Sequence, residues 1–223
     1  MATTSKTTDF EDTTRAQVLA LLGGGNASMT FKQAVANYPL DQINTKPPHV
    51  PYSPWQLLEH MRMTQRDILD FVQSDHYREL SWPRDYWPPQ GTDVDVTAWH
   101  RTIAEFEEDL AAIQSLVADP TRDLHAQLAN ADADHYTLLR EALVVADHNA
   151  YHTGEFAILR QIMGTWPPIT RKGAARGAGS VPLLAIVPFA TSRHPGSCVG
   201  QLCRTVVPGS CIEQLYRTAG SGR

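Results

Sequence analysis

The sequence predicts an all-α protein built around a four-helix bundle. Apolar residues recur at a helical spacing of three and four in four separate stretches before residue 168. Two of these stretches are long, and no segment before residue 168 shows the alternating pattern of a strand. The chain has 223 residues, which is enough for a domain with a core, and we expect this bundle to occupy residues 10–168.

The first predicted helix covers about residues 10–22, whose apolar side chains gather on one side. We expect it to break at Gly23-Gly24-Gly25, because glycine is unfavourable inside a helix. A shorter helical piece resumes near Ser28. Residues 1–9 hold no apolar run, so they predict a flexible polar lead and not a secretory signal.

The second predicted helix has the clearest start signal in the chain. Ser53 stands at the N-cap, Pro54 at the first helical position, and Gln56 completes a capping box. The loop after this helix, residues 81–92, is rich in aromatic residues and proline, and we expect it to lie across one end of the bundle. Its aromatic side chains predict either a pocket wall or a hydrophobic cap; they are Trp82, Tyr86 and Trp87.

The last two predicted helices are the longest. One covers about residues 95–118, where apolar residues alternate steps of four and three, as in the seam of an antiparallel bundle. It ends at Asp119-Pro120, because the residue before a proline avoids the helical conformation. The other covers about residues 135–163 and stops at Gly164.

Residues 169–223 differ in composition from the rest of the chain. They are rich in Gly, Ala, Arg, Ser and Pro, keep no helical period, and contain all three cysteines, whose spacing matches no zinc motif. We interpret them as a tail outside the core. A disordered basic tail, a small appended module and an out-of-frame translation of GC-rich DNA remain open as explanations.

Charge is spread unevenly along the chain, whose net charge at pH 7 is −5. Residues 1–168 contain 12 basic and 23 acidic residues, whereas residues 169–223 contain 7 basic residues and one acidic residue. A bundle with a net charge of −11 offers no electrostatic reason to bind nucleic acid. No apolar run is long enough to predict a membrane span, and we expect a cytoplasmic protein.

The most informative motif is the pair His148 and His152, four residues apart in the last predicted helix. At this spacing both imidazoles project from one side of a helix, and two such imidazoles can chelate one divalent metal ion. A third ligand must come from elsewhere in the fold. The best candidate is His60, which lies at the edge of the apolar stripe of the second helix and can turn into the bundle.

The helix face that carries this pair is otherwise apolar. Asn149 and His152 interrupt its stripe and His148 flanks it, although burying an unpartnered polar group costs about 1–3 kcal/mol. A metal ion would offset that cost; the plainer interpretation is a set of hydrogen-bonded or solvent-facing histidines. Glu155, on the side of His148, is either an acceptor or base behind the ligands or a salt-bridged surface residue. The chain lacks the HExxH motif, a phosphate loop and a nucleophile elbow.

The remaining histidines predict no site, because they fall in loops, on exposed faces or at helix ends; they are His49, His76, His100, His125, His135 and His194.

Several blocks of sequence carry a family resemblance: SPWQLLEHMR at residues 53–62 with DIL at 67–69, HNAYHTGE at 148–155 with LR at 159–160, and MGTWPP at 163–168. With these blocks in this order, the chain resembles the DinB/YfiT-like superfamily of metal-binding four-helix bundles. The resemblance covers about residues 10–168, and the tail departs from the pattern.

The resemblance implies a metal site formed by His60, His148 and His152, which holds Ni, Zn, Fe or Mn and leaves positions for water or substrate. It also implies a bacterial protein that forms a homodimer. Members of the superfamily include metal-dependent hydrolases and transferases that use low-molecular-weight thiols such as mycothiol or bacillithiol.

Two functions of different classes follow. The first is a hydrolase or thiol transferase that acts on a small molecule, because an ion with open positions can activate either water or a thiol. The second is a non-catalytic stress-related or binding bundle whose metal is structural or absent. DNA binding is suggested only by the damage-inducible name of the superfamily, and the acidic bundle argues against it.

Overall fold

The computed structural model describes residues 3–131 and 135–167. These residues form five α-helices and two short 3₁₀ helices and contain no β-strand, which confirms the predicted all-α class. No helix in these ranges combines the length and the apolar character that a membrane crossing requires. The predicted tail over residues 169–223 lies outside the described residues.

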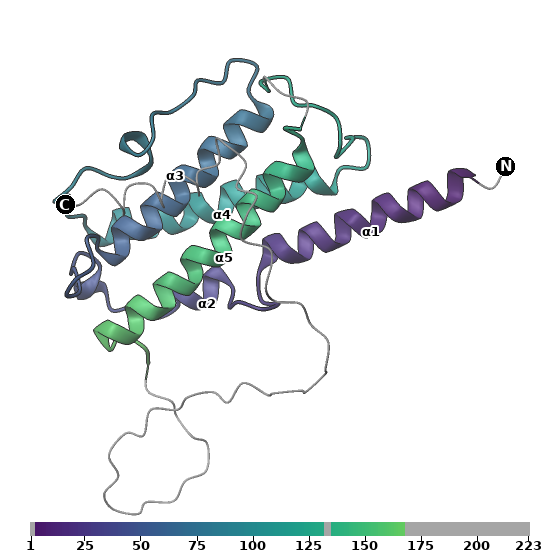
Figure 1. The fold of residues 1–223 in the computed structure, drawn as a ribbon. Helices are drawn as coiled ribbons and strands as arrows, with labels where there is room; N and C mark the ends of the chain where they lie inside the picture. The colour runs from purple at the N-terminus through teal and green to yellow at the C-terminus, as the bar shows by residue number, and fades with distance from the viewer. Residues whose placement is uncertain (1–2, 132–134, 168–223) are drawn as a thin grey trace, which may run out of the picture. The chain divides into compact units, whose positions relative to one another are not determined.

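Four long helices make up the bundle (Figure 1): α1 (Thr3–Gly23), α3 (Pro54–Gln73), α4 (Val96–Ala118) and α5 (Leu138–Met163). Helix α3 packs against both α4 and α5, and α1 packs against the same two helices. The short helix α2 (Phe31–Val35) packs against α5. The four predicted helical stretches are therefore the four long helices of the fold.

Helix α1 begins at Thr3, so the predicted start at residue 10 is wrong, and the lead over residues 1–9 is helical from Thr3 on. Threonine and serine disfavour a helix by only a few tenths of a kcal/mol, and extending a formed helix adds one hydrogen bond for each residue. The predicted break is confirmed, because Gly24 and Gly25 both adopt a positive φ, of 67° and 84°, that ends the helix.

The predicted capping box at the start of α3 is confirmed. The Ser53 hydroxyl accepts from the Gln56 amide at 3.3 Å, and the Gln56 side chain accepts from the Ser53 amide at 2.9 Å. Helix α5 starts at Leu138 and not near residue 135, because the Thr137 hydroxyl caps it by accepting from the Arg140 amide. This helix ends at Gly164 as predicted, with a φ of 65°.

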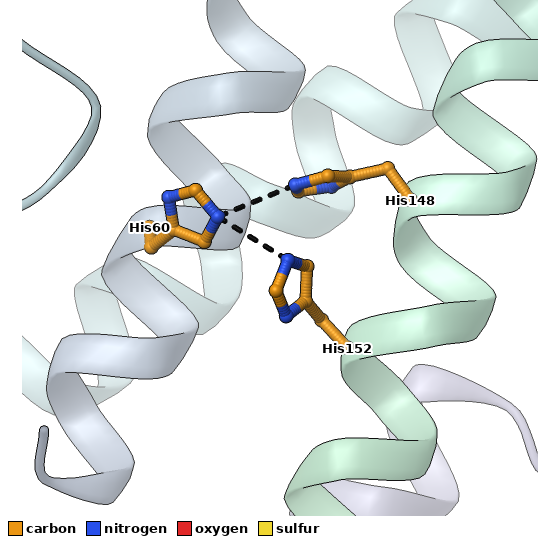
Figure 2. Close-up of side chains that lie close together, drawn as sticks. All are labelled: His60, His148 and His152. Atoms are coloured by element: carbon orange, nitrogen blue, oxygen red, sulfur yellow. Dashed lines mark hydrogen bonds between the residues drawn. The ribbon is translucent and has the colours of Figure 1, made fainter. Parts of the chain in front are cut away.

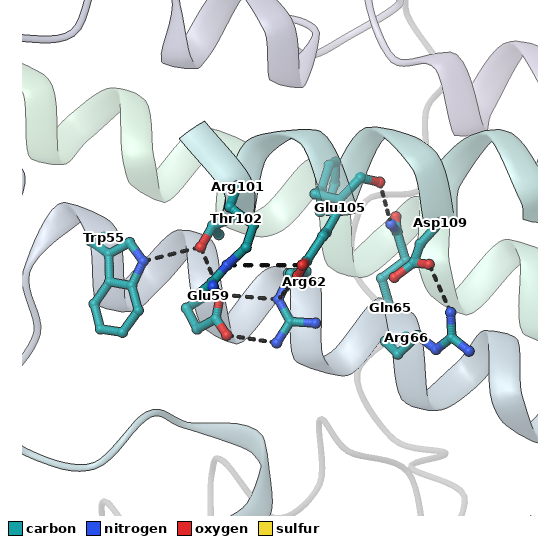
Figure 3. Close-up of polar contacts among 10 residues, drawn as sticks. Trp55, Glu59, Arg62, Gln65, Arg66, Arg101, Thr102, Glu105 and Asp109 are labelled. Atoms are coloured by element: carbon teal, nitrogen blue, oxygen red, sulfur yellow. Dashed lines mark hydrogen bonds and ion pairs between the residues drawn. The ribbon is translucent and has the colours of Figure 1, made fainter. Parts of the chain in front are cut away.

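Helices α3 and α4 run in the same direction, whereas the antiparallel packing expected for residues 95–118 is found between α4 and α5, where Trp99 near the start of α4 meets Phe156 near the end of α5. Polar contacts between the two helices advance together along both (Figure 3). Near the start of each, the Trp55 indole donates to Thr102, which donates to Glu59 at 2.8 Å. One to two turns later, the Gln65 amide donates to the Phe106 carbonyl at 2.8 Å. These bonds, two of them buried and one part-buried, fix the register of α3 against α4 along the part of α3 that carries the site described below.

Two parallel neighbouring helices need a long connection that returns along the bundle. Residues 74–95 make this connection and contain the 3₁₀ helix η2 (Arg84–Tyr86), which contacts α3. Figure 1 shows the connection running back beside α3. The prediction that the aromatic loop crosses one end of the bundle is therefore wrong, because the loop follows the side of α3.

Two clusters of buried apolar side chains form the core. The first contains Ala34, Tyr38, Ile43, Trp55, Leu57, Leu58, Met61, Trp99, Phe106, Phe156 and Leu159. The second contains Val18, Leu22, Leu69, Ile113, Val117, Leu124, Leu138, Ala142, Val145 and Ala146. The apolar stripes predicted for the three later helices supply most of both clusters, as expected for amphipathic helices.

Arg160 is the most deeply buried charged residue of the described core, with no exposed surface. Its guanidinium donates to the carbonyl oxygens of Ala34, Ala36 and Thr165, at 2.6 to 2.9 Å. It also lies over the ring of Trp166, 4.0 Å from the centroid. One side chain thus joins the end of α5 to the segment around α2.

Candidate metal centre

Three histidines from two helices meet inside the bundle (Figure 2). His60 projects from α3, and His148 and His152 project from α5. The Nε2 atom of His60 lies 3.3 Å from Nε2 of His152 and 3.4 Å from Nε2 of His148. One nitrogen from each ring lies within 4.8 Å of the other two, a spacing that can hold one metal ion. The structure therefore brings together the three residues singled out from the sequence.

Asn149, the other polar residue of the apolar stripe, has a partner of its own. Its amide nitrogen donates to the Gln65 side chain on α3 at 2.8 Å. Gln65 donates in turn to the backbone of α4, so these amides form a buried polar link across the bundle. Asn149 therefore lies beside the histidine cluster as part of the packing between helices and not as one of the converging groups.

The proton position on His60 follows from its neighbour. Its Nδ1 atom lies 2.7 Å from the backbone carbonyl oxygen of Tyr86. Because a carbonyl can only accept, Nδ1 carries the proton and donates. In the neutral ring, the lone pair of Nε2 then points toward His148 and His152.

His152 is oriented in the same way by a carboxylate. Its Nδ1 atom lies 2.6 Å from Glu155 Oε2, and a carboxylate also only accepts. The Tyr52 hydroxyl donates to the other oxygen of Glu155. Burial raises the pKa of Glu155, but the hydrogen bonds from His152 and Tyr52 outweigh burial and hold this pKa below its usual range. Glu155 therefore supports His152 as an ionised acceptor.

Glu155 matches the predicted alternative of an acceptor behind the ligands, and the ligand that it contacts is His152. The two residues are three positions apart on α5, a spacing at which helical side chains meet. The alternative of a salt-bridged surface residue does not describe this side chain, which is 28% exposed and bonded to the histidine cluster.

The donor set fits a divalent cation. When both rings are in the Nδ1–H neutral form, the Nε2 lone pairs of His60 and His152 face each other 3.3 Å apart, and neither nitrogen can donate to the other. His148 Nδ1 is buried and has no hydrogen-bond partner among the described residues. Burial lowers the pKa of His60 to about 4 and that of His148 well below its usual value, which favours the neutral form that binds metals. A cation between the three rings would relieve the facing lone pairs.

Aromatic side chains enclose this cluster. Trp87 stacks on His60, with centroids 4.1 Å apart, and Tyr52 stacks on Trp87 at 5.3 Å. Tyr151 contacts the His152 ring edge-on. Of the two alternatives for the aromatic loop, the hydrophobic cap describes Trp87 better, because its ring covers the face of the buried His60. A cavity of about 430 Å³ lies elsewhere on α3, and its lining residues do not include the three histidines.

Within residues 3–131 and 135–167, the His, Cys, Asp and Glu side chains that gather in a group of three or more close enough to hold a metal ion are these three histidines. The structure places His49, His76, His100, His125 and His135 outside the cluster. His194 and the cysteines Cys198, Cys203 and Cys211 lie outside the described residues.

Sequence reasoning missed three supports of the cluster. Tyr52 carries no motif, and its contact with Glu155 depends on how the start of α3 meets α5. The carbonyl of Tyr86 is a backbone atom, for which the residue type carries no signal. Trp87 was recognised as part of an aromatic loop, but its place on His60 depends on the path of the connection beside α3.

A family model described as the DinB superfamily matches residues 26–156, which is more than half of the chain and includes all three histidines. No curated protein matches the chain, and no solved structure does.

Proposed function

The chain belongs to the DinB superfamily, and on this basis we propose that it is a metal-dependent enzyme acting on a small molecule. In this proposal, one divalent ion is held by His60, His148 and His152, and the reaction is a hydrolysis or a thiol transfer. One observation carries the proposal: three imidazoles, two of them buried and one partly buried, converge, and two of them are oriented by acceptors on the far nitrogen.

The number of ligands favours a catalytic site over a closed structural one. Three neutral imidazoles leave at least one coordination position for another ligand. When bound, a divalent ion supplies Lewis-acid activation of a water molecule or of a thiol. Nitrogen ligands suit Zn, Ni and Fe, and Mn prefers oxygen, so we propose Zn, Ni or Fe ahead of Mn.

The chain's own residues contribute orientation and shielding. Glu155 and Tyr52 hold the His152 ring, and the Tyr86 carbonyl holds the His60 ring. Trp87 keeps water from the outer face of His60. These contacts fix the ligands before the ion binds, so less ordering has to accompany metal binding.

Burial of the histidines favours a second candidate function, a non-catalytic bundle with a structural metal. His60 is 1% exposed and His152 is 4% exposed, and the lining of the 430 Å³ cavity includes neither. In this case metal removal would lower stability, and no substrate would be converted.

An activity comparison tests the proposal. The full-length chain is stripped with a chelator, reloaded separately with Zn, Ni, Fe(II) or Mn, and assayed against esters and amides and against thiols paired with an electrophile. We expect turnover in one of these assays that needs the reloaded metal and is lost in His152→Ala. Equal rates with and without metal, or in wild type and His152→Ala, would overturn the enzyme proposal. A melting temperature that falls on chelation without any turnover would support the structural metal instead.

A further inference from the structure

Tyr86 joins two points on the same face of α3. Its backbone carbonyl accepts from His60 Nδ1 at 2.7 Å, and its side-chain hydroxyl donates to Asp67 Oδ2 at 2.6 Å. His60 and Asp67 are seven residues apart on α3, which is about two helical turns or roughly 10 Å. Seven residues return a helix to nearly the same direction, so both side chains can reach one residue lying alongside.

Asp67 anchors the connection between α3 and α4 at two places. Its second oxygen, Oδ1, accepts from the Tyr77 hydroxyl at 3.0 Å. Tyr77 stands near the start of the connection, and Tyr86 stands about halfway along it. Hydrogen bonds to an ionised acceptor are shorter and stronger than neutral ones, which makes this half-buried carboxylate an effective tether.

The tethered segment is itself held in a turn. The Asp85 carboxylate accepts from the Ser81 amide at 2.9 Å, and the Tyr86 amide donates to the Pro83 carbonyl at 3.2 Å. Trp87 follows directly and stacks on His60. Movement of Tyr86 would therefore disturb both contacts that orient the His60 ring, the hydrogen bond at Nδ1 and the stacked indole.

We propose that Asp67 is a positioning residue for the metal centre: through the Tyr86 hydroxyl it holds the carbonyl that keeps His60 Nε2 turned toward His148 and His152. This inference rests on the proposed function. It gives Asp67, about two helical turns from His60 on α3, a role in metal binding. A residue that only tethered the connection to α3 would have no such role.

The test compares variants of the full-length chain. Tyr86→Phe removes the hydroxyl and keeps the backbone carbonyl, and Asp67→Ala removes the acceptor. Tyr77→Phe is the matched control, because it removes the other hydroxyl bound to the same carboxylate. Asp67→Asn keeps one acceptor oxygen and serves as the conservative replacement.

Zn²⁺ affinity is measured by competition with a chromophoric chelator, and the free energy of unfolding of the metal-free protein is measured in urea.

We expect Tyr86→Phe and Asp67→Ala each to weaken Zn²⁺ binding by about 10- to 100-fold, as is usual when a group that orients a ligand is lost. The double variant should have about the same Zn²⁺ affinity as the single variant with the lower affinity, because both changes remove the same hydrogen bond. Tyr77→Phe should stay within about twofold of wild type, and Asp67→Asn should recover part of the affinity. Wild-type affinity in Tyr86→Phe, or an equal loss in Tyr77→Phe, would overturn the inference.

A second measurement separates this inference from the proposed function. Long-range ¹H–¹⁵N spectra of the metal-free protein report which nitrogen of His60 carries the proton. We expect the Nδ1–H form in wild type and in Tyr77→Phe, and a mixture of the two forms in Tyr86→Phe. If wild type binds no metal but shows this pattern, the proposed function fails and the positioning of His60 stands. If wild type binds metal and His60 stays entirely in the Nδ1–H form in Tyr86→Phe, the positioning role of Asp67 is wrong and the proposed function stands.

Discussion

The indole of Trp87 and the imidazole of His60 lie face to face, with ring centroids 4.1 Å apart and 2° between their planes. His60 also donates from Nδ1 to the carbonyl of Tyr86, the residue before Trp87. A stacked ring resists tilting of the imidazole, and the hydrogen bond resists its rotation. Two consecutive residues of one connection thus fix the ring from two sides, which leaves Nε2 in one position relative to α5.

Replacing Trp87 is expected to affect stability and metal binding together. Trp87→Ala should lower the free energy of unfolding by about 1–3 kcal/mol, because a half-buried aromatic side chain and its stacking are lost. Zn²⁺ affinity should fall as the His60 ring gains freedom, whereas Trp87→Phe should keep most of both. Urea unfolding and chelator competition measure the two effects, and an unchanged Zn²⁺ affinity in Trp87→Ala would show that the stack does not support the site.

Glu155→Gln is expected to weaken metal binding with little effect on the fold. The change removes the negative charge that accepts from His152 Nδ1, and losses of such acceptors usually cost about 10- to 100-fold in metal affinity. Glu107→Gln is the control, because Glu107 is an exposed acid on α4. Calorimetric titration with Zn²⁺ measures both. Equal affinities in the two variants would mean that Glu155 does not support the ligand.

Metal binding is expected to raise thermal stability reversibly. An ion that binds only the folded state stabilises it by about 2.7 kcal/mol at a free concentration 100 times its Kd. For a chain of this size that corresponds to a rise in Tm of about 5–10 °C. Differential scanning calorimetry with and without Zn²⁺ measures it, and a chelator should reverse it. The same experiment on His148→Ala should show almost no shift; a full shift there would place the ion elsewhere.

Arg160 is expected to be essential to the fold and not to the metal centre. Arg160→Met leaves the carbonyl oxygens of Ala34, Ala36 and Thr165 buried without this donor, and should cost at least about 3 kcal/mol. Arg160→Lys should also be strongly destabilising, because one ammonium cannot reproduce the planar guanidinium contacts. Urea unfolding measures both, and a loss below about 1 kcal/mol in either variant would contradict this role.

Local features of the fold could be predicted because neighbouring residues alone determine them. The capping box depends on Ser53 and Gln56, which are three residues apart. The end of α5 depends on Gly164, whose left-handed conformation suits glycine. The true start of α5 had a readable signal as well, because Thr137 directly precedes the apolar period and acts as the N-cap.

The candidate site could be predicted in part. The spacing of His148 and His152 places them on one face of any helix, and the stripe position of His60 allowed it to turn inward. Their meeting and the partners at each Nδ1 atom depend on how α3 packs on α5 and on a connection that returns beside α3. Helix direction and loop path are properties of the whole bundle, and no periodicity in a single segment encodes them.

Several expectations from the sequence and the resemblance stay predictions. They are the homodimer, the cytoplasmic location, the lack of nucleic-acid binding, and the identity of the small-molecule substrate or thiol.

The most direct test of the account is the metal content of the full-length chain, purified without chelators or a histidine tag and measured by inductively coupled plasma mass spectrometry beside His148→Ala. We predict about one Zn, Ni or Fe ion per wild-type chain, either as purified or after the stripped protein is reconstituted. His148→Ala should hold no such ion. An absence of metal in both proteins, even after reconstitution, would contradict the account and leave His60, His148 and His152 as polar groups of the bundle core.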